Sequence, residues 1–210
     1  MELNSIELNL KNKYNYLVNN PSDINEHLPT LYKYAKECES IIECGVRGCV
    51  SSWALTYGLL HNNKSKKKIL LNDINKCNIN ELIQYSINLN IELYYKWEND
   101  LDLDIKENFD LIFIDTWHVY GQLKRELNKF SPIINKYIIL HDTTIDEIYG
   151  ESIRHNNDLK KESLLSNIPE EEISCGLGKA ITEFLELNKN WELYEKFTNN
   201  NGLTILHRIN

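Results

Sequence analysis

Residues 40–48 of the chain read S-I-I-E-C-G-V-R-G, a compact apolar strand that runs directly into a turn with two glycines. A glycine directly after a strand lets the chain turn tightly and brings backbone amides against a ligand. The G-x-x-G spacing differs from the G-x-G-x-x-G of a dinucleotide pyrophosphate loop. The stretch predicts an α/β protein with a ligand-binding loop after this strand. A helix-capping turn with two permissive glycines is the alternative, because it would have the same sequence pattern.

Outward from this stretch, short apolar runs alternate with longer amphipathic ones, which is typical of parallel strands joined by helices. The run D-L-I-F-I at residues 110–114 is nearly continuously apolar, as expected when both faces of a sheet are covered. Residues 145–169 are polar and irregular. We predict five strand–helix units, with strands at residues 40–44, 68–73, 91–95, 110–114 and 137–140, and helices after Gly48 and at about 79–89, 120–130 and 178–187.

The chain ends differently from how it begins. Residues 191–197 and 203–209 read as two strands joined by T-N-N-N-G, a hairpin turn. We expect them to form an antiparallel pair at the sheet edge. Two-residue periodicity should bury Leu203, Ile205 and Ile209 on one face. A terminal hairpin argues against a dinucleotide-binding domain, which normally ends on a parallel strand.

Length favours one domain over residues 1–210. Within it we expect a helical extension at residues 1–39, broken by Pro21 and Pro29, and an α/β core at residues 40–210. The predicted fold is a mostly parallel seven-stranded sheet with a C-terminal antiparallel hairpin and helices on both faces. The oligomeric state, a homo-oligomer included, stays open.

Composition excludes several classes of protein. The formal net charge of −8 is opposite to the basic face of a nucleic-acid binder, and the basic run at residues 64–68 is expected in a solvated loop. No apolar stretch approaches the ~20 residues of a membrane helix, and the N-terminus lacks a signal-peptide pattern. Five cysteines without a C-x-x-C pair indicate reduced thiols rather than a zinc or disulfide framework. We therefore expect a cytoplasmic protein without nucleic-acid or membrane partners.

Polar residues close each predicted strand, where ligands bind in open α/β sheets. Asp73 ends the second strand, and its carboxylate can accept both hydroxyls of an adenosine ribose. An acidic cap for the next helix is the alternative. Asp100 follows the third strand, where a polar side chain could reach an adenine amino group, unless it belongs to a solvated acidic loop.

The fourth and fifth strands lead into Asp115-Thr116-Trp117-His118 and His141-Asp142. Two carboxylates and two imidazoles at one edge can hold a hard divalent cation and position a base. His118 is three residues beyond Asp115, and an unperturbed pKa near 6.5 suits proton transfer at neutral pH. The alternative is that His118 caps the next helix and His141 hydrogen-bonds a carboxylate.

These segments resemble a known family. I-E-C-G-V-R-G-C-V-S-S-W-A-L at residues 42–55 resembles the first motif of class I S-adenosylmethionine-dependent methyltransferases of the cephalosporin hydroxylase-like group, which is related to macrocin-type sugar O-methyltransferases. Residues 111–142 resemble the same group, with I-D-x-x-H-x-Y, a helix, S-P, a strand and H-D-T. The resemblance covers roughly residues 40–145.

The resemblance implies that Glu43 and Gly45 lie against the methionine part of the cofactor and that Asp73 holds its ribose. It also implies metal-binding carboxylates at Asp115 and Asp142. Cofactor-binding residues are expected at Glu43, Gly45, Arg47, Gly48, Ser51, Asp73, Asp100 and Asp115, and metal ligands at Asp115, His141 and Asp142.

The chain departs from the family at three positions. His141 stands where the relatives usually carry an acidic residue, which leaves Mg²⁺ or Mn²⁺ open. Trp117 stands where they often carry a carboxylate base, so His118 becomes the predicted base, with Asp115 as its catalytic partner. Cys49 replaces a common glycine of the first loop.

The sequence therefore favours a methyltransferase that uses S-adenosylmethionine and acts on a hydroxyl oxygen of a small molecule, a sugar or nucleotide-sugar by analogy with the relatives. An NAD-dependent oxidoreductase is disfavoured by the missing third glycine and the terminal hairpin. A methyltransferase-like binding protein without activity is the other alternative.

Overall fold

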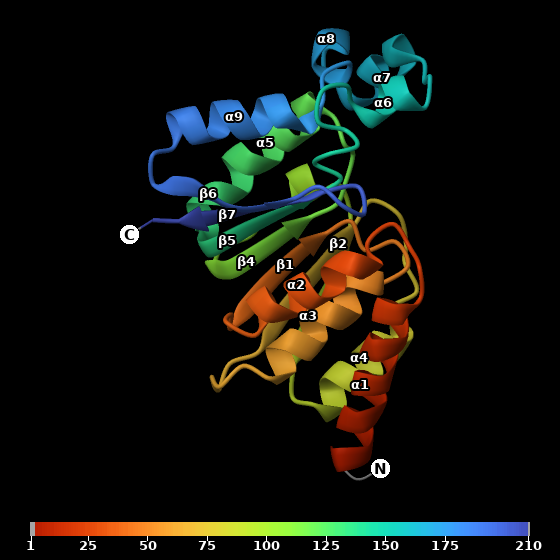
Figure 1. Cartoon of the computed structure of the whole chain (residues 1–210), viewed down its shortest axis with the longest axis vertical. Helices are drawn as coiled ribbons and strands as arrows, with labels where there is room; N and C mark the ends of the chain where they lie inside the picture. Colours follow the sequence, from red (N-terminus) through yellow and green to blue (C-terminus); the bar gives the residue numbers. More distant parts are fainter. Residues whose placement is uncertain (1–2, 210) are drawn as a thin grey trace. The chain divides into compact units, whose positions relative to one another are not determined.

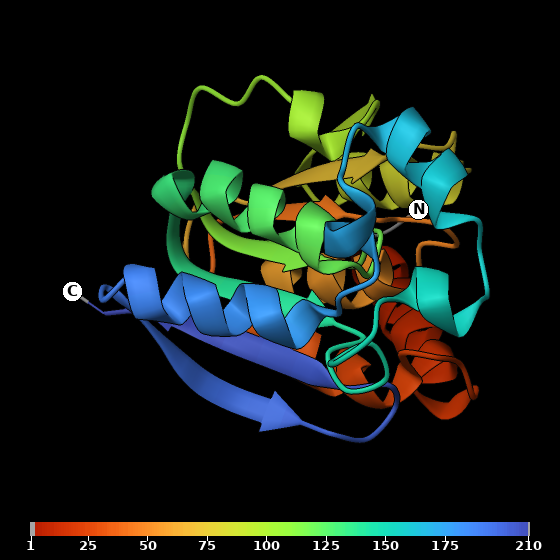
Figure 2. The same cartoon turned by 90° about the horizontal axis from the view of Figure 1, so that it is seen from above.

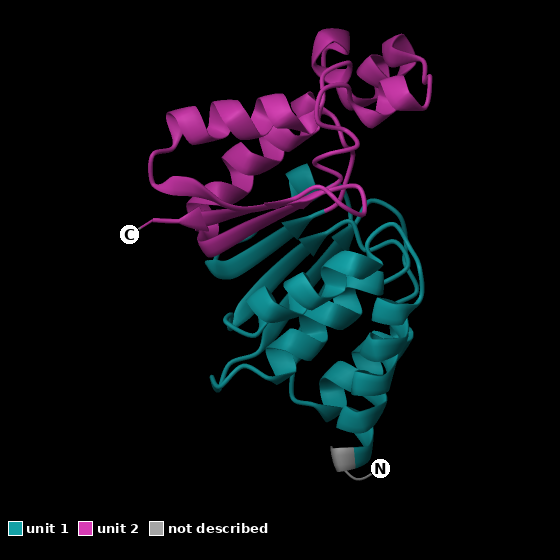
Figure 3. Ribbon diagram, viewed as in Figure 1, with its two compact units in different colours: residues 1–114 teal, residues 115–210 magenta. Residues whose placement is uncertain are grey.

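The computed structural model describes residues 3–209, which form two compact units that meet in the sequence between Ile114 and Asp115 (Figure 3). Within these residues, seven strands follow the order β3-β2-β1-β4-β5-β7-β6, in which the first four belong to the first unit and the last three to the second. The single domain predicted over residues 1–210 stays a prediction.

The first unit is built on four parallel strands, β1 (Ser40–Cys44), β2 (Lys68–Asp73), β3 (Glu92–Trp97) and β4 (Phe109–Ile114). β1 lies between β2 and β4, and β3 pairs with the outer side of β2. Every residue of β1 and β2 is buried, as expected for strands covered on both faces. These are the first four strands that the sequence predicts, and β3 runs two residues further than expected.

Helices of the first unit pack closely on one another. α1 (Leu3–Asn19) and α2 (Leu28–Ala35) precede β1, and α3 (Val50–Leu60) and α4 (Asn80–Asn88) follow β1 and β2. Figure 1 shows α2 and α3 side by side. A Cβ atom on Gly58 would lie 2.5 Å from the Ala35 Cβ and 2.7 Å from the Tyr32 carbonyl oxygen. The close approach of these two helices thus depends on a glycine.

One detail of the predicted first unit is wrong. Pro29 does not break a helix but lies in the first turn of α2, where proline lacks only an N–H that has no partner within the helix. The short 3₁₀ helices η1 (Asn25–His27) and η2 (Asp100–Asp102) lie before α2 and after β3.

The second unit contains β5 (Ile134–His141), with the hairpin strands β6 (Trp191–Phe197) and β7 (Leu203–Arg208). β7 pairs antiparallel with both β5 and β6. Figures 1 and 2 both show α5 (Tyr120–Phe130) and α9 (Leu177–Leu187) side by side. The remaining short helices are η3 (Ser131–Ile133), α6 (Glu151–Arg154), α7 (Leu159–Ser166) and α8 (Glu170–Ile173).

The predicted C-terminal hairpin is confirmed, but one of the three residues expected to be buried is exposed. Leu203 and Ile205 are fully buried, but Ile209 is 44% exposed because β7 ends at Arg208. Gly202 has a φ of +99°, and a Cβ there would lie 2.5 Å from the backbone nitrogen of Thr144. The hairpin turn therefore packs tightly against the segment that follows β5.

Within residues 3–209, no helix combines the length and the apolar character that crossing a membrane takes.

Candidate functional site

The turn after β1 has a strained backbone. Gly45 has a φ of +92°, Arg47 of +40° and Cys49 of +62°. A non-glycine residue held in this left-handed region costs about 1–3 kcal/mol, and such strain clusters at ligand sites. Cys49 adopts a conformation that a glycine takes without strain, which is the residue the resemblance leads one to expect there. No described atom lies within 4 Å of where a Cβ on Gly48 would stand.

Asp73 fixes this turn through its carboxylate. Its Oδ2 accepts hydrogen bonds from the backbone N–H groups of Val46 and Arg47, both at 2.9 Å. Its Oδ1 accepts a third from the Asn75 N–H at 2.7 Å. A carboxylate has about four lone-pair sites, so three are already used. These hydrogen bonds leave one lone-pair site for a ribose hydroxyl, and the ribose role of Asp73 stays a prediction.

Glu43 is fully buried in β1 and accepts a hydrogen bond from the Ser51 hydroxyl in α3. Burial first, and the charge of Glu43 second, raise the pKa of the Cys49 thiol to about 12. Cys49 is therefore an unreactive thiol. Asp100 is buried in η2. Seven of the eight predicted cofactor residues lie in the first unit, and Asp115 is the first residue of the second.

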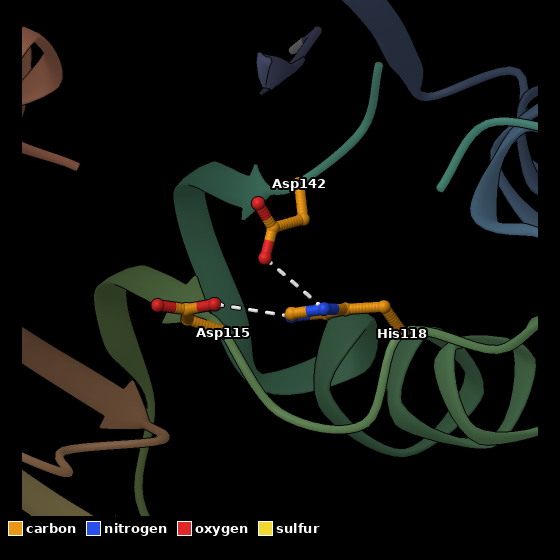
Figure 4. Close-up of side chains that lie close together, drawn as sticks. All are labelled: Asp115, His118 and Asp142. Carbon is orange, nitrogen blue, oxygen red and sulfur yellow. Dashed lines mark hydrogen bonds and ion pairs between the residues drawn. The ribbon is translucent and has the colours of Figure 1, made fainter. Parts of the chain in front are cut away.

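In the second unit, the imidazole of His118 lies between two carboxylates (Figure 4). Its Nε2 is 3.1 Å from the Asp115 Oδ1, in good hydrogen-bond geometry. Its Nδ1 is 3.0 Å from the Asp142 Oδ2. Asp115 directly follows β4 and Asp142 directly follows β5, so the sequence prediction that these strand ends supply chemistry to one place agrees with this geometry.

Asp115 receives hydrogen bonds from two imidazoles. Besides His118, the Nδ1 of His141 lies 3.3 Å from the same Oδ1 atom. His141 is 2% exposed, and its Nδ1 is also 3.5 Å from the Asp142 Oδ1. Asp115 thus orients both rings. Ligation of a metal by the His141 Nδ1 would require this hydrogen bond to break.

Three charged residues of this cluster were missed by the sequence analysis. The Nδ1 of His118 is also 3.4 Å from the Asp146 Oδ2 and 3.3 Å from the Glu151 Oε2. Asp146 is fully buried and receives a two-bond fork from Arg154, with both distances 2.8 Å. Asp146, Glu151 and Arg154 lie in a segment whose polar, irregular sequence shows no helical or strand periodicity. The four-residue spacing of Asp142 and Asp146 was a weak indication that the two side chains share one side of a helical turn.

The cluster stabilises the charged forms of Asp115 and His118, whereas burial raises the pKa of Asp142. Although burial opposes it, the hydrogen bonds from His118 and His141 lower the pKa of Asp115. Burial likewise works against a charged His118 ring, yet Asp115, Asp146 and Glu151 raise its pKa well above 6.5. These carboxylates therefore favour the protonated form of the His118 ring in the cation-free protein. A general base must be unprotonated, so the predicted base role requires this ring to lose its proton first.

The residues present fit a divalent cation by their chemistry. One group with ligand atoms within 4.8 Å of one another is Asp115, His118 and Asp142, and a second is His118, Asp146 and Glu151. Both groups contain His118 and neither contains His141. The predicted ligands Asp115 and Asp142 are thus brought together, but with His118 between them.

Comparison with known proteins addresses the fold. No family model and no curated protein matches the sequence. The O-methyltransferase from Bacillus cereus, solved with SAH, matches with a TM-score of 0.57 and 12% identity over 97% of this chain and 90% of that chain. The N-methyltransferase NodS from Bradyrhizobium japonicum WM9 matches with a TM-score of 0.56 and 10% identity over 90% and 97%. The O-methyltransferase TomG from Streptomyces achromogenes, involved in tomaymycin synthesis and solved with SAM, matches with a TM-score of 0.55 and 10% identity over 89% and 81%.

The fold is that of the class I methyltransferases. This confirms the predicted mostly parallel seven-stranded sheet with its C-terminal antiparallel hairpin. At 10–12% identity the likeness concerns the fold alone.

Proposed function

We propose that this protein is an S-adenosylmethionine-dependent methyltransferase that methylates a hydroxyl oxygen of a small molecule. The observation that carries the proposal is the likeness, over nearly the whole chain, to methyltransferases solved with SAM or SAH. The strained turn after β1 supports it, because it lies where the sequence predicts the cofactor loop.

The first unit would hold the cofactor. Gly48 leaves open space beside the turn, and the fourth lone-pair site of Asp73 is available to a ribose hydroxyl. Glu43, tied to Ser51, would fix the start of α3 beside the methionine part. The cofactor supplies an electrophilic methyl group on a sulfonium, and the chain's own residues bind and orient it.

The reaction balances without an oxidant. The C–S bond of the sulfonium breaks as a C–O bond forms, the hydroxyl proton leaves to a base, and the products are a methyl ether and S-adenosylhomocysteine. Asp115 and His118 are the pair proposed to handle this proton, with Asp115 orienting the ring. A sugar or nucleotide-sugar acceptor rests on the resemblance of residues 40–145 alone.

Ligand binding tests the cofactor assignment. Calorimetry with S-adenosylhomocysteine and with NAD should show binding of the first and none of the second. Tighter binding of NAD would favour an oxidoreductase instead. No binding of either would overturn both.

Activity is tested separately, because binding alone also fits an inactive relative. The protein is incubated with S-adenosylmethionine and a panel of sugars and nucleotide-sugars, and mass spectrometry looks for the gain of one methyl group. Phenols and amines serve as comparison acceptors. Methylation of amines alone would contradict transfer to oxygen, and binding without any product would favour the inactive binding protein.

A further inference from the structure

We propose that His118 Nδ1, Asp146 and Glu151 form a binding site for a divalent transition-metal ion, with Asp115 as the carboxylate that orients the histidine. This ligand set differs from the Asp115, His141 and Asp142 set expected from the sequence. It shares His118 with the proposed methyl transfer. A ring that ligates through Nδ1 and donates from Nε2 to Asp115 has no nitrogen left to accept a proton, so metal binding and the base role are alternative states of His118. The metal site can be tested without S-adenosylmethionine.

Asp115 fixes the orientation of the His118 ring. Its Nε2 donates to the Asp115 Oδ1 at 3.1 Å, so the proton of a neutral ring is placed on Nε2 and the lone pair on Nδ1. Metal-binding histidines almost always donate their other ring N–H to a carboxylate or a carbonyl in this way. The ring is thus set up to ligate through Nδ1.

Three carboxylate oxygens surround the Nδ1 atom of His118. This atom is buried, and none of the three carboxylate oxygens at 3.0–3.4 Å from it accepts a hydrogen bond of ordinary geometry. One ring nitrogen carries one proton and can serve one acceptor. Several oxygens around Nδ1, none aligned with it, are what a cation between them would produce.

The spacing of the ligand atoms can be compared with that around a metal ion. Ligands at about 2.1 Å from a metal ion lie roughly 3.0 Å apart in octahedral and roughly 3.4 Å apart in tetrahedral geometry. The His118 Nδ1 lies 3.4 Å from the Asp146 Oδ2 and 3.3 Å from the Glu151 Oε2. All three ligand atoms lie within 4.8 Å of one another. The two distances from His118 Nδ1 match those between neighbouring ligands of one ion.

Arg154 holds the side chain of Asp146 in place. This carboxylate is fully buried, and the fork from Arg154 fixes its plane. The fork uses two of the four lone-pair sites, which leaves one on Oδ2 toward His118. Glu151 begins α6 and is anchored at its backbone, where its N–H donates to the His118 carbonyl oxygen at 3.0 Å. The Asp146 carboxylate is therefore held before a metal arrives, and the backbone of Glu151 is held beside it.

The ligand chemistry limits which metal ions suit the site. Imidazole suits Zn²⁺, Fe²⁺ and Ni²⁺, whereas carboxylates suit Mg²⁺, Ca²⁺ and Mn²⁺. One imidazole with two carboxylates favours Mn²⁺ or Zn²⁺ over Mg²⁺. We use Mn²⁺ as the probe because it is paramagnetic.

The first experiment measures Mn²⁺ affinity by calorimetry on the chelator-treated full chain without S-adenosylmethionine. Loss of an outer partner of a metal site alone costs about 10–100-fold in affinity, so Glu151→Gln should weaken Mn²⁺ binding at least tenfold. Glu147→Gln is the matched control, because Glu147 lies in the same segment and pairs at the surface with Lys196. Equal affinity in wild type and Glu151→Gln would overturn the site.

The second experiment identifies the nitrogen ligand in the Mn²⁺-loaded protein by pulsed electron paramagnetic resonance. Coupling to a directly bound imidazole nitrogen should be present in wild type and in His141→Gln, and lost in His118→Gln. Loss in His141→Gln with retention in His118→Gln would overturn the proposal in favour of the sequence-derived set. Absence of coupling in folded wild type would also overturn it, whether or not the protein methylates anything.

Discussion

Replacing Asp73 by asparagine separates two roles for this residue. The sequence assigns Asp73 to the ribose of the cofactor, whereas the structure shows its carboxylate accepting three backbone hydrogen bonds from the turn after β1 and from Asn75. If the carboxylate mainly fixes the turn, Asp73→Asn should lower the free energy of unfolding even without a ligand.

The magnitude follows from the hydrogen bonds. Bonds to a charged group contribute about 1.5–3 kcal/mol each, and neutral ones about 0.5–1.5 kcal/mol. The amide oxygen of asparagine can retain the two bonds at Oδ2 in weaker, neutral form, which costs about 1 kcal/mol each. Its NH₂ group would face the Asn75 N–H, and that third bond is lost. Allowing for relaxation, we expect a loss of about 2–4 kcal/mol.

Urea denaturation measures this change, with Asp104→Asn as control. Asp104 is a largely exposed acidic residue that pairs with Lys106 in solvent, so its replacement should cost no more than about 1 kcal/mol. S-adenosylhomocysteine affinity should fall by the one hydroxyl contact that remains for Asp73, about 10–150-fold. Unchanged stability together with a large loss of affinity would refute the turn-fixing role.

Three further predictions concern the second unit. Gly202→Ala should lower the free energy of unfolding, measured by urea denaturation, by about 2–4 kcal/mol, because the φ of Gly202 is +99° and a Cβ would clash with Thr144. The control Gly48→Ala should lower it by at most about 1 kcal/mol, and equal losses in the two variants would contradict the prediction. In chelator-treated protein, the raised pKa of His118 adds to the free energy of unfolding, fully below pH 6.5 and less as pH rises through the folded-state pKa. His118→Gln should therefore flatten the decline of the unfolding free energy with pH. Equal slopes of unfolding free energy against pH in wild type and variant would argue against a charged ring. His118→Ala should lower methyl transfer at least about 100-fold, and wild-type turnover across the pH range would place proton handling elsewhere.

Much of the fold could be predicted because local and tertiary signals agree. α5 spans residues 120–130 as expected, since its amphipathic pattern stops at a Ser-Pro pair that forms η3. The hairpin follows from T-N-N-N-G, in which Asn200, Asn201 and Gly202 all have positive φ. Alternation failed at β7, where Thr204 and Leu206 are buried along with Leu203 and Ile205. The two-residue period is uninformative when both faces of a strand are covered.

The site was predictable only where it follows strands. Asp115 and Asp142 could be found because each directly follows a strand. Asp146 and Glu151 could not, because their positions depend on the turn in which the Asp146 N–H donates to the Asp142 carbonyl oxygen. The role of Asp73 was also hidden, since a carboxylate that binds a ribose and one that binds backbone amides look alike in a sequence.

The charges around His118 are poorly explained by stability alone. Four carboxylates surround one imidazole, and the opposing charges are this ring, His141 and Arg154. Desolvation of buried ion pairs offsets much of their attraction, and well-packed apolar residues often stabilise a fold equally well. Asp142 adds strain, because it adopts a φ of +56°. Among the described residues of the cluster, four carboxylates thus face three groups that can carry positive charge, and burial raises the pKa of Asp142. A bound divalent cation would balance that charge, which is the simplest physical reason for such an arrangement directly after β4 and β5.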